Sequence, residues 1–281
     1  MQDFLELAVS ATASGCVYGL IALAYLLMIR PTGIINFAVG EWAMLGAFGG
    51  HLLLSRYEWP YWLGMLAVLA FMFLVGWVTE RIAVRPLVER GTGVLAPILA
   101  LLGVLVITRE IISVSFPPDP LPVPYAFELQ DQKYFIIGVT ALVFAGAWLF
   151  FEKTVLGRAF EAVALNRRAA ALMGINLSRV TAFSFAAGAA VAGLGGLLVA
   201  PNISAHYLMG VPLAIQGFTA LVIGGVGRVE GALIGGLLLA FAEQLTIRYA
   251  PIPSGFAQGV PLLFLMAFLI VRPTGLLRAR A

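Results

Sequence analysis

The sequence predicts an all-α, polytopic helical membrane protein with about eight or nine membrane segments. Hydrophobic residues make up 61% of its 281 residues and charged residues only 11%, whereas a soluble domain usually carries about 25% charged residues. A chain of this size cannot hide so much apolar surface from water, so lipid must be the solvent for most of it. The 31 glycines favour close packing between membrane helices.

A spanning helix needs about 20 mostly apolar residues. The candidate runs are 4–29, 34–54, 61–79, 94–112, 134–151, 181–200 and 256–271. The stretch 214–247 is longer than one span, and "GGVGRVEG" interrupts it, which predicts two arms, 214–227 and 231–247. At about 1.5 Å per residue the first arm covers only roughly 21 Å, which is typical of a half-helix or a re-entrant segment.

The basic residues predict the orientation of these segments. Lys and Arg gather in loops 80–93 and 152–180 and in the C-terminal tail, whereas loop 113–133 has only Lys133 and loop 201–213 has none. The positive-inside rule then places the basic loops and the C-terminus in the cytosol and the N-terminus in the periplasm. We expect no cleavable signal, because no basic region precedes the first apolar run.

The string Arg-Pro-Thr-Gly occurs twice, in "MIRPTGIIN" (28–36) and "IVRPTGLLR" (270–278), each time where an apolar run stops. The predicted topology puts both copies on the cytosolic face. There Arg can extend to the interface, and Pro and Gly can end the helix.

Polar residues interrupt the run "TGIINFAVGEWAMLGAFGG" (32–50). Asn36 and Glu41 lie where a helix should span the bilayer, and a carboxylate there must face protein or a watery cavity. Gly40 allows irregular backbone or close packing beside them. Two interpretations stay open: these side chains stabilise a broken helix, or they line a substrate path.

The cytosolic loop "TVLGRAFEAVALNRRAAALMGINLSRV" (154–180) is too long to be a simple connector. Its alanines favour a helix, its arginines keep that helix out of the hydrocarbon, and Gly174 can end it. It is either an interfacial helix on the lipid headgroups or a docking helix for a cytosolic partner.

The Gly-rich segment "QGFTALVIGGVGRVEGALIGGLLLAFAEQL" (216–245) contains Gly224, Gly225, Gly227 and Gly231. No strand precedes it and both flanks are apolar, so a dinucleotide-binding loop is excluded. Close helix packing around a bend fits better. No GxxxxGK[ST] phosphate loop occurs anywhere, so we expect no ATPase site in this chain.

Several other residues suggest ordinary structural roles. Arg109 and Glu110 lie side by side near the end of one run and need not pair with each other, so we expect interfacial anchors. His51 and His206 are isolated and too few for a metal site. The net charge of +3, with basic residues scattered between apolar runs, predicts no nucleic-acid partner.

Three of these stretches together resemble one family. "TGIINFAVGEWAMLGAF", "GRAFEAVALNRRAAALMGINLSRV" and "FTALVIGGVGRVEGALIGGLLLAFAEQL" are similar to segments of LivH-type permeases from high-affinity branched-chain amino acid ABC importers, and the tail "VRPTGLL" also fits. The resemblance covers the chain from about residue 15 to its end. It implies that residues 1–281 form a single transmembrane permease domain, a type II-like ABC importer bundle in the inner membrane.

The resemblance also implies that several proteins carry out transport together. A periplasmic solute-binding protein delivers the solute, this chain and a LivM-like second permease form the pathway, and two LivG/LivF-like cytosolic ATPases bind ATP and Mg²⁺. No cofactor is expected in this chain. In loop 152–180 a coupling helix docks in an ATPase groove, and we carry that role onto Glu161, Ala162, Ala164, Asn166, Arg167, Arg168 and Gly174. The loop reads Glu-Ala-Val-Ala rather than the family's Glu-Ala-Ala form.

The pathway is expected between the two permeases, lined by Asn36, Gly40, Glu41, Gly224, Gly225, Gly227 and Gly231. The main alternative is a secondary transporter driven by an ion gradient, for which only Glu41 and Glu243 could serve as ion-coupling carboxylates. The sequence contains no catalytic constellation that would support a membrane-embedded enzyme. Similar permeases serve branched-chain amino acids, urea, amides and aromatic acids, and this sequence does not distinguish among these solutes.

Overall fold

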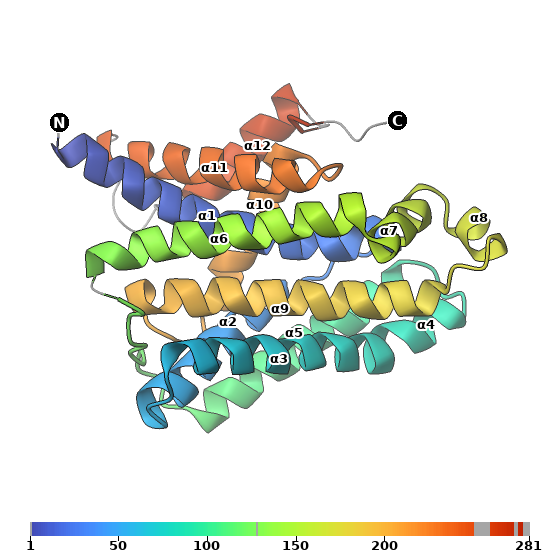
Figure 1. Ribbon diagram of the computed structural model, residues 1–281, viewed down its shortest axis with the longest axis horizontal. Coiled ribbons are helices and arrows are strands. Elements are labelled where there is room, and N and C mark those ends of the chain that lie inside the picture. The colour runs from blue at the N-terminus through green and yellow to red at the C-terminus, as the bar shows by residue number, and fades with distance from the viewer. Residues whose placement is uncertain (1, 128, 250–258, 273–274, 278–281) are drawn as a thin grey trace.

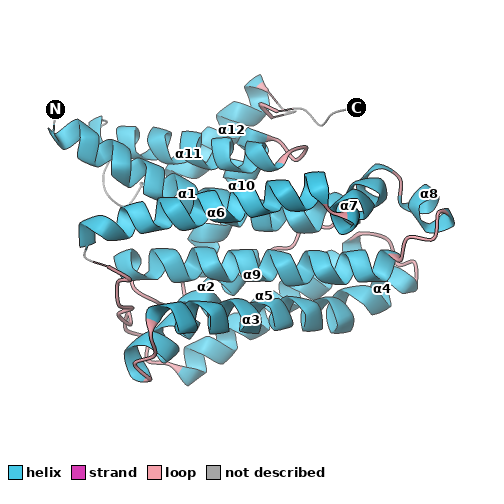
Figure 2. Cartoon of the chain, viewed as in Figure 1, coloured by secondary structure: helices cyan, strands magenta, loops and turns pink. Residues whose placement is uncertain are grey.

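The chain folds into an elongated bundle of helices, shown by a computed structural model that describes residues 2–127, 129–249, 259–272 and 275–277 (Figure 1). Helices dominate the described part of the chain (Figure 2). The extended pairing described there is one antiparallel bridge between Leu121 and Ala205. The prediction of an all-helical protein is therefore confirmed.

The helices follow one another closely along the chain, and two of the segments, η1 and η2, are π-helical. In chain order they are α1 (Gln2–Thr32), α2 (Val39–Gly50), η1 (His51–Arg56), α3 (Tyr61–Thr79), η2 (Glu80–Val84), α4 (Arg85–Glu89), α5 (Leu95–Ser115), α6 (Leu129–Lys153), α7 (Val155–Leu165), α8 (Arg167–Leu172), α9 (Leu177–Ile203), α10 (Gly210–Gly224), α11 (Val229–Tyr249) and α12 (Val260–Val271).

Six of these helices are long and apolar enough to cross a membrane: α1, α3 with its continuation through η2 and α4, α5, α6, α9 and α11. They coincide with six of the apolar runs expected from the sequence. The predicted half-helix 214–227 is α10, which has 15 residues. The predicted run 256–271 matches α12 from Val260 onward, and its residues 256–258 lie outside the described residues.

The core of the bundle is built on α1 and α9. Helix α1 packs against α9, α10 and α11, and α9 packs against α2 and α3. Most of the apolar stretch of α1 and α9 is buried, whereas α3, α5 and α6 leave most of theirs exposed. This distribution is typical of a membrane bundle, in which outer helices present apolar side chains to lipid or to another subunit.

Glycine lets the inner helices approach to backbone contact. A Cβ on Gly46 of α2 would overlap the carbonyl oxygen of Gly193 on α9, and a Cβ on Gly196 would overlap that of Ala43. Small residues at a helix crossing maximise van der Waals contact where no hydrophobic effect operates between helices. Such crossings account for several of the glycines in the sequence.

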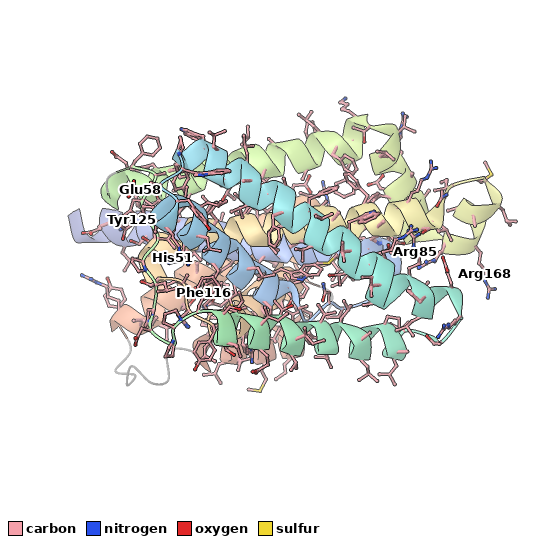
Figure 3. The ribbon with its side chains drawn as sticks, turned by 90° about the horizontal axis from the view of Figure 1, so that it is seen from below. His51, Glu58, Arg85, Phe116, Tyr125 and Arg168 are labelled. Atoms are coloured by element: carbon pink, nitrogen blue, oxygen red, sulfur yellow. The ribbon has the colours of Figure 1, made fainter. Side chains whose placement is uncertain are left out.

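The two ends of the bundle differ in charge. Arg85 and Arg168 lie at the end that carries α4, α7 and α8, which we call the basic end, and His51, Glu58 and Tyr125 lie at the opposite, distal end (Figure 3). The N-terminus also lies at the distal end (Figure 1). Loops 80–93 and 152–180 thus lie at the same end of the bundle, as the distribution of Lys and Arg predicts. The N-terminus lies at the other end.

The Arg-Pro-Thr-Gly strings act as helix ends. Helix α1 continues through Pro31 to Thr32 and stops at Gly33, whose φ of 67° is left-handed. Gly275 in the second copy has a φ of 76°. Glycine adopts this conformation without the steric penalty of a side chain. Pro273 and Thr274 of the second copy lie outside the described residues.

Candidate functional site

Glu41 lies in the first turn of α2, at the point where α2 meets the start of α10. Its side chain is only 1% exposed. A Cβ on Gly210, the first residue of α10, would lie 2.7 Å from Glu41 Oε2, and a Cβ on Gly40 would overlap the Gly210 carbonyl. The carboxylate therefore rests against the N-terminal turn of α10, where the helix dipole favours negative charge.

Arg109 of α5 supplies the positive partner of Glu41. One Nη2 proton of its guanidinium is donated to Glu41 Oε1, across 68 residues of sequence. The expectation that Arg109 is an interfacial anchor is therefore wrong, because its side chain turns inward to a buried carboxylate. Two buried atoms of this pair, Glu41 Oε2 and Arg109 Nε, have no hydrogen-bond partner among the described residues.

Asn36 is completely buried and makes local contacts. Its Oδ1 accepts a hydrogen bond from the Ala38 N–H at 2.9 Å, and its Nδ2 approaches Met28 Sδ at 3.4 Å. These contacts hold the turn that connects α1 to α2, in agreement with the interpretation that Asn36 stabilises a broken helix. Its predicted place in a pathway stays a prediction.

The glycines of the late segment form the junction of α10 and α11. A Cβ on Gly224 would overlap the Gly231 carbonyl, Gly225 has a φ of 93°, and Gly227 is half-buried in the same turn. Since α10 has 15 residues, this junction lies about 21 Å along the helix from Gly210. The residues predicted to line one pathway thus form two separate groups, one around Glu41 and one at the α10–α11 turn.

The predicted coupling loop forms two helices rather than one. Asn166 breaks the run with extended backbone (φ −154°, ψ 99°), and its side chain caps α8 by accepting from the Ala169 N–H at 3.0 Å. The other end of α8 is closed by Gly174, whose φ of 82° confirms the expected stop. The expectation of a continuous helix through Asn166 is corrected, because asparagine favours the cap over the helix interior.

Some of the residues assigned to coupling face the bundle, and others are exposed away from it. Glu161 lies 3.8 Å from Arg30 of α1, and Arg167 lines a cavity of about 350 Å³ between η2, α4 and the start of α9. Ala162 is half-buried, whereas Ala164 and Arg168 are exposed. Arg168 points away from the bundle at the tip of the basic end (Figure 3). Only part of the predicted set is therefore free to meet another protein.

Three large apolar side chains are exposed at this tip, and we did not predict a role for them from the sequence. Leu165 is 79% exposed, Leu172 90% and Met173 83%. Leu165 is the last residue of α7, Leu172 is the last residue of α8, and Met173 follows it. Their signal in the sequence is that Leu and Met recur within a basic loop that must lie outside the hydrocarbon, where they have no lipid to cover them.

The same cavity contains a second buried carboxylate. Glu80 of η2 is 1% exposed and lies 3.4 Å from Arg85 of α4, and the Ser178 hydroxyl lacks a hydrogen-bond partner among the described residues. Helices α3 to α4 and α8 to α9 therefore meet around polar groups at the base of the α7–α8 protrusion.

The comparisons with known proteins agree with this architecture. The family model described as "Branched-chain amino acid transport system / permease component" matches residues 7–270. The chain is 31% identical to the high-affinity branched-chain amino acid transport system permease protein BraD of Pseudomonas aeruginosa, over 99% of this chain and 96% of BraD. It is 29% identical to the LivH protein of Escherichia coli K12, over 98% of this chain and 95% of LivH.

A solved structure shares the fold. PsaBC from Streptococcus pneumoniae, in complex with Fab, superposes with a TM-score of 0.53 at 12% identity, and the match covers 93% of this chain and 88% of that one. At this identity the likeness concerns the fold alone. The family match covers nearly the whole chain and is the stronger result. It shows that the chain belongs to the branched-chain amino acid transport system permease family, whose members are multi-pass membrane permeases.

Proposed function

We propose that this chain is the membrane-spanning permease subunit of an ABC importer that moves branched-chain amino acids across the bacterial inner membrane. Separate cytosolic ATPases drive it, a second, LivM-like permease completes the pathway, and a periplasmic binding protein delivers the solute. The support from the comparisons is that BraD and LivH, which match this chain over nearly its whole length, are permeases of branched-chain amino acid transport systems.

The observation that carries the proposal is the apolar tip of the α7–α8 protrusion. Leu172 and Met173 are exposed in a loop that the charge pattern places in water. Exposed apolar clusters rimmed by charge are typical of protein-binding surfaces. An ATPase groove that covers these side chains would hold α8 as a lever, and Arg167 and Glu161 would transmit its movement to the bundle.

The same arrangement favours an orientation and a count of segments. With the basic end in the cytosol, the N-terminus is periplasmic and the C-terminus cytoplasmic. Adding α2 with η1, α10 and α12 to the six long helices gives nine membrane elements, of which α10 is a half-helix. This count supports our proposal that residues 1–281 form one domain with the type II-like bundle that the family resemblance implies.

Reconstitution tests the proposal. The chain is co-purified with the second permease and ATPases encoded beside it, placed in proteoliposomes with the binding protein, and assayed for [¹⁴C]leucine accumulation with ATP on the ATPase side. We expect accumulation that needs ATP and persists when ionophores collapse proton and sodium gradients. Accumulation that follows an ion gradient without ATP would instead establish the secondary transporter.

A further inference from the structure

We propose that a groove between α3 and α9, at the basic end of the bundle, binds an anionic phospholipid. Arg81, Arg85 and Arg179 contact its phosphate. Phe73 and Trp77 lie along one of its acyl chains. This inference goes beyond the proposed function, because it needs only that the chain lies in a membrane and does not depend on which solute is moved.

The groove is a cavity of about 600 Å³ on the outer side of the bundle. The end of α3 with η2 and the start of α4 form one wall, and the beginning of α9 with the residue before it forms the other. Phe73 is 40% exposed and Trp77 41%. Helix α3 leaves most of its apolar stretch exposed, so the groove opens on a face that the membrane covers. Arg85 marks its basic end (Figure 3).

Both walls change from apolar to basic in the same direction. Arg81 follows Trp77 by four residues, so it lies about 6 Å nearer the basic end. Arg179 precedes Phe183 by four residues on α9, which runs the opposite way, and lies nearer the basic end by the same amount. Tryptophan is enriched where hydrocarbon meets headgroups, and arginine extends from there to the phosphates. The walls therefore match a phospholipid whose headgroup lies at the basic end.

The groove carries positive charge that the protein does not neutralise. The described residues that line it include three arginines and no acidic residue. Arg85 lies 3.4 Å from the buried Glu80, whereas neither Arg81 nor Arg179 forms an ion pair with any residue that the structure describes. Guanidinium groups bind phosphate oxygens through paired N–H donors. An anionic headgroup supplies the missing charge, and the ammonium of a zwitterionic headgroup would be repelled.

The walls of the groove are held in place before a lipid binds. A Cβ on Gly76 of α3 would overlap the Phe185 carbonyl of α9, so the two backbones touch beside the groove. The Phe73 and Phe183 rings meet edge to face at 6.0 Å, and the Arg81 guanidinium lies 5.9 Å from the centre of the Trp77 ring. Little ordering is then needed on binding. The N-terminus of α9 adds partial positive charge at the same place.

Quenching of tryptophan fluorescence by brominated lipid tests the site, because bromine quenches only at short range. The purified protein is reconstituted in phosphatidylcholine vesicles with increasing fractions of brominated phosphatidylglycerol or, in a parallel series, brominated phosphatidylcholine. We expect part of the fluorescence to be quenched at lower fractions of phosphatidylglycerol than of phosphatidylcholine. Trp77→Phe should remove this selective part. Trp148→Phe, at a residue 47% exposed on α6, should keep it. The reverse result would place the lipid elsewhere and overturn the inference.

A pair of arginine variants separates this groove from general attraction to an anionic membrane. Arg81→Gln with Arg179→Gln should raise the phosphatidylglycerol fraction needed by about thirtyfold, since each arginine contributes about fivefold near an anionic headgroup. Arg158→Gln with Arg168→Gln removes the same charge from exposed positions on α7 and α8 and should change nothing. Equal losses in both pairs would refute the site. Unchanged quenching by phosphatidylcholine shows that the variants keep Trp77 in the bilayer.

Two further arms distinguish the lipid from other occupants. Glycerophosphoglycerol, the headgroup without acyl chains, should not relieve the selective quenching, and relief would assign the groove to a soluble phosphate instead. The titration is repeated on the protein together with the subunits that co-purify with it, where the selective quenching should persist. Its loss there would make the groove a contact between subunits and overturn the lipid assignment.

Discussion

The Tyr18 hydroxyl of α1 donates a hydrogen bond of 2.8 Å to Glu243 Oε2 of α11, joining two helices 225 residues apart in sequence. Both residues are buried. Within a membrane bundle such a bond fixes which faces of the two helices meet, because an unpaired carboxyl there would be left without water.

Tyr18→Phe is expected to lower the stability of the detergent-solubilised protein by about 1 kcal/mol, the usual size of an interhelical hydrogen bond in a membrane. Thermal unfolding of the purified permease measures this. Gln244→Ala, which alters the half-buried neighbour of Glu243, serves as the control and should change stability much less. Equal losses in both variants would mean that the bond contributes nothing specific.

The crossing of α2 and α9 predicts a strong effect of side-chain size at Gly46. Gly46→Val should separate the two helices, because its side chain would overlap the Gly193 backbone, and overpacking of this kind costs roughly 1–3 kcal/mol or more. The yield of monodisperse protein after solubilisation is the measurement. Gly103→Ala on α5, where a Cβ meets nothing within 4 Å, should leave the yield unchanged.

The exposed tip of α8 predicts where the ATPases bind. Leu172→Asp and Met173→Asp should each weaken co-purification of the ATPases by about tenfold or more, since each removes a buried apolar side chain from the interface. The permease itself should remain stable, because neither side chain packs in the bundle. Val155→Asp, at a residue 75% exposed on the first turn of α7, is the matched control. If the ATPases co-purify normally with both tip variants, they do not dock on this tip.

His206 predicts a dependence of stability on pH. Burial lowers the pKa of its imidazole below the usual value of 6.5, and its Nδ1 accepts from the Leu208 N–H at 3.2 Å. The unfolded chain therefore binds a proton more readily, so the contribution of neutral His206 is complete above pH 6.5 and is lost as the pH falls through the lower, folded pKa. Thermal melts from pH 8 down to pH 5 should show this decline in the unaltered protein and in His51→Gln. His206→Gln should flatten it.

Sequence reasoning succeeded where the signal is local. A run such as 94–112 has enough apolar residues to identify α5 by itself, and Gly174 and Gly33 end helices because each adopts a left-handed φ. The Glu41–Arg109 pair could not be predicted in this way. The two residues become neighbours only because α5 packs beside the start of α2, and no periodicity records that contact. The break at Asn166 was missed for another reason: alanines on both sides favour helix, and only the backbone geometry shows that the asparagine caps α8.

The central position of α1 has a consequence for biogenesis. It leaves the ribosome before the other described helices, and α9 and α11, which enclose it, are synthesised much later along this sequence. During that interval its alanines and glycines, small enough for tight contact, have lipid or the insertion machinery as their neighbours. Assembly of this permease must therefore begin with an unshielded centre and finish by wrapping later helices around it.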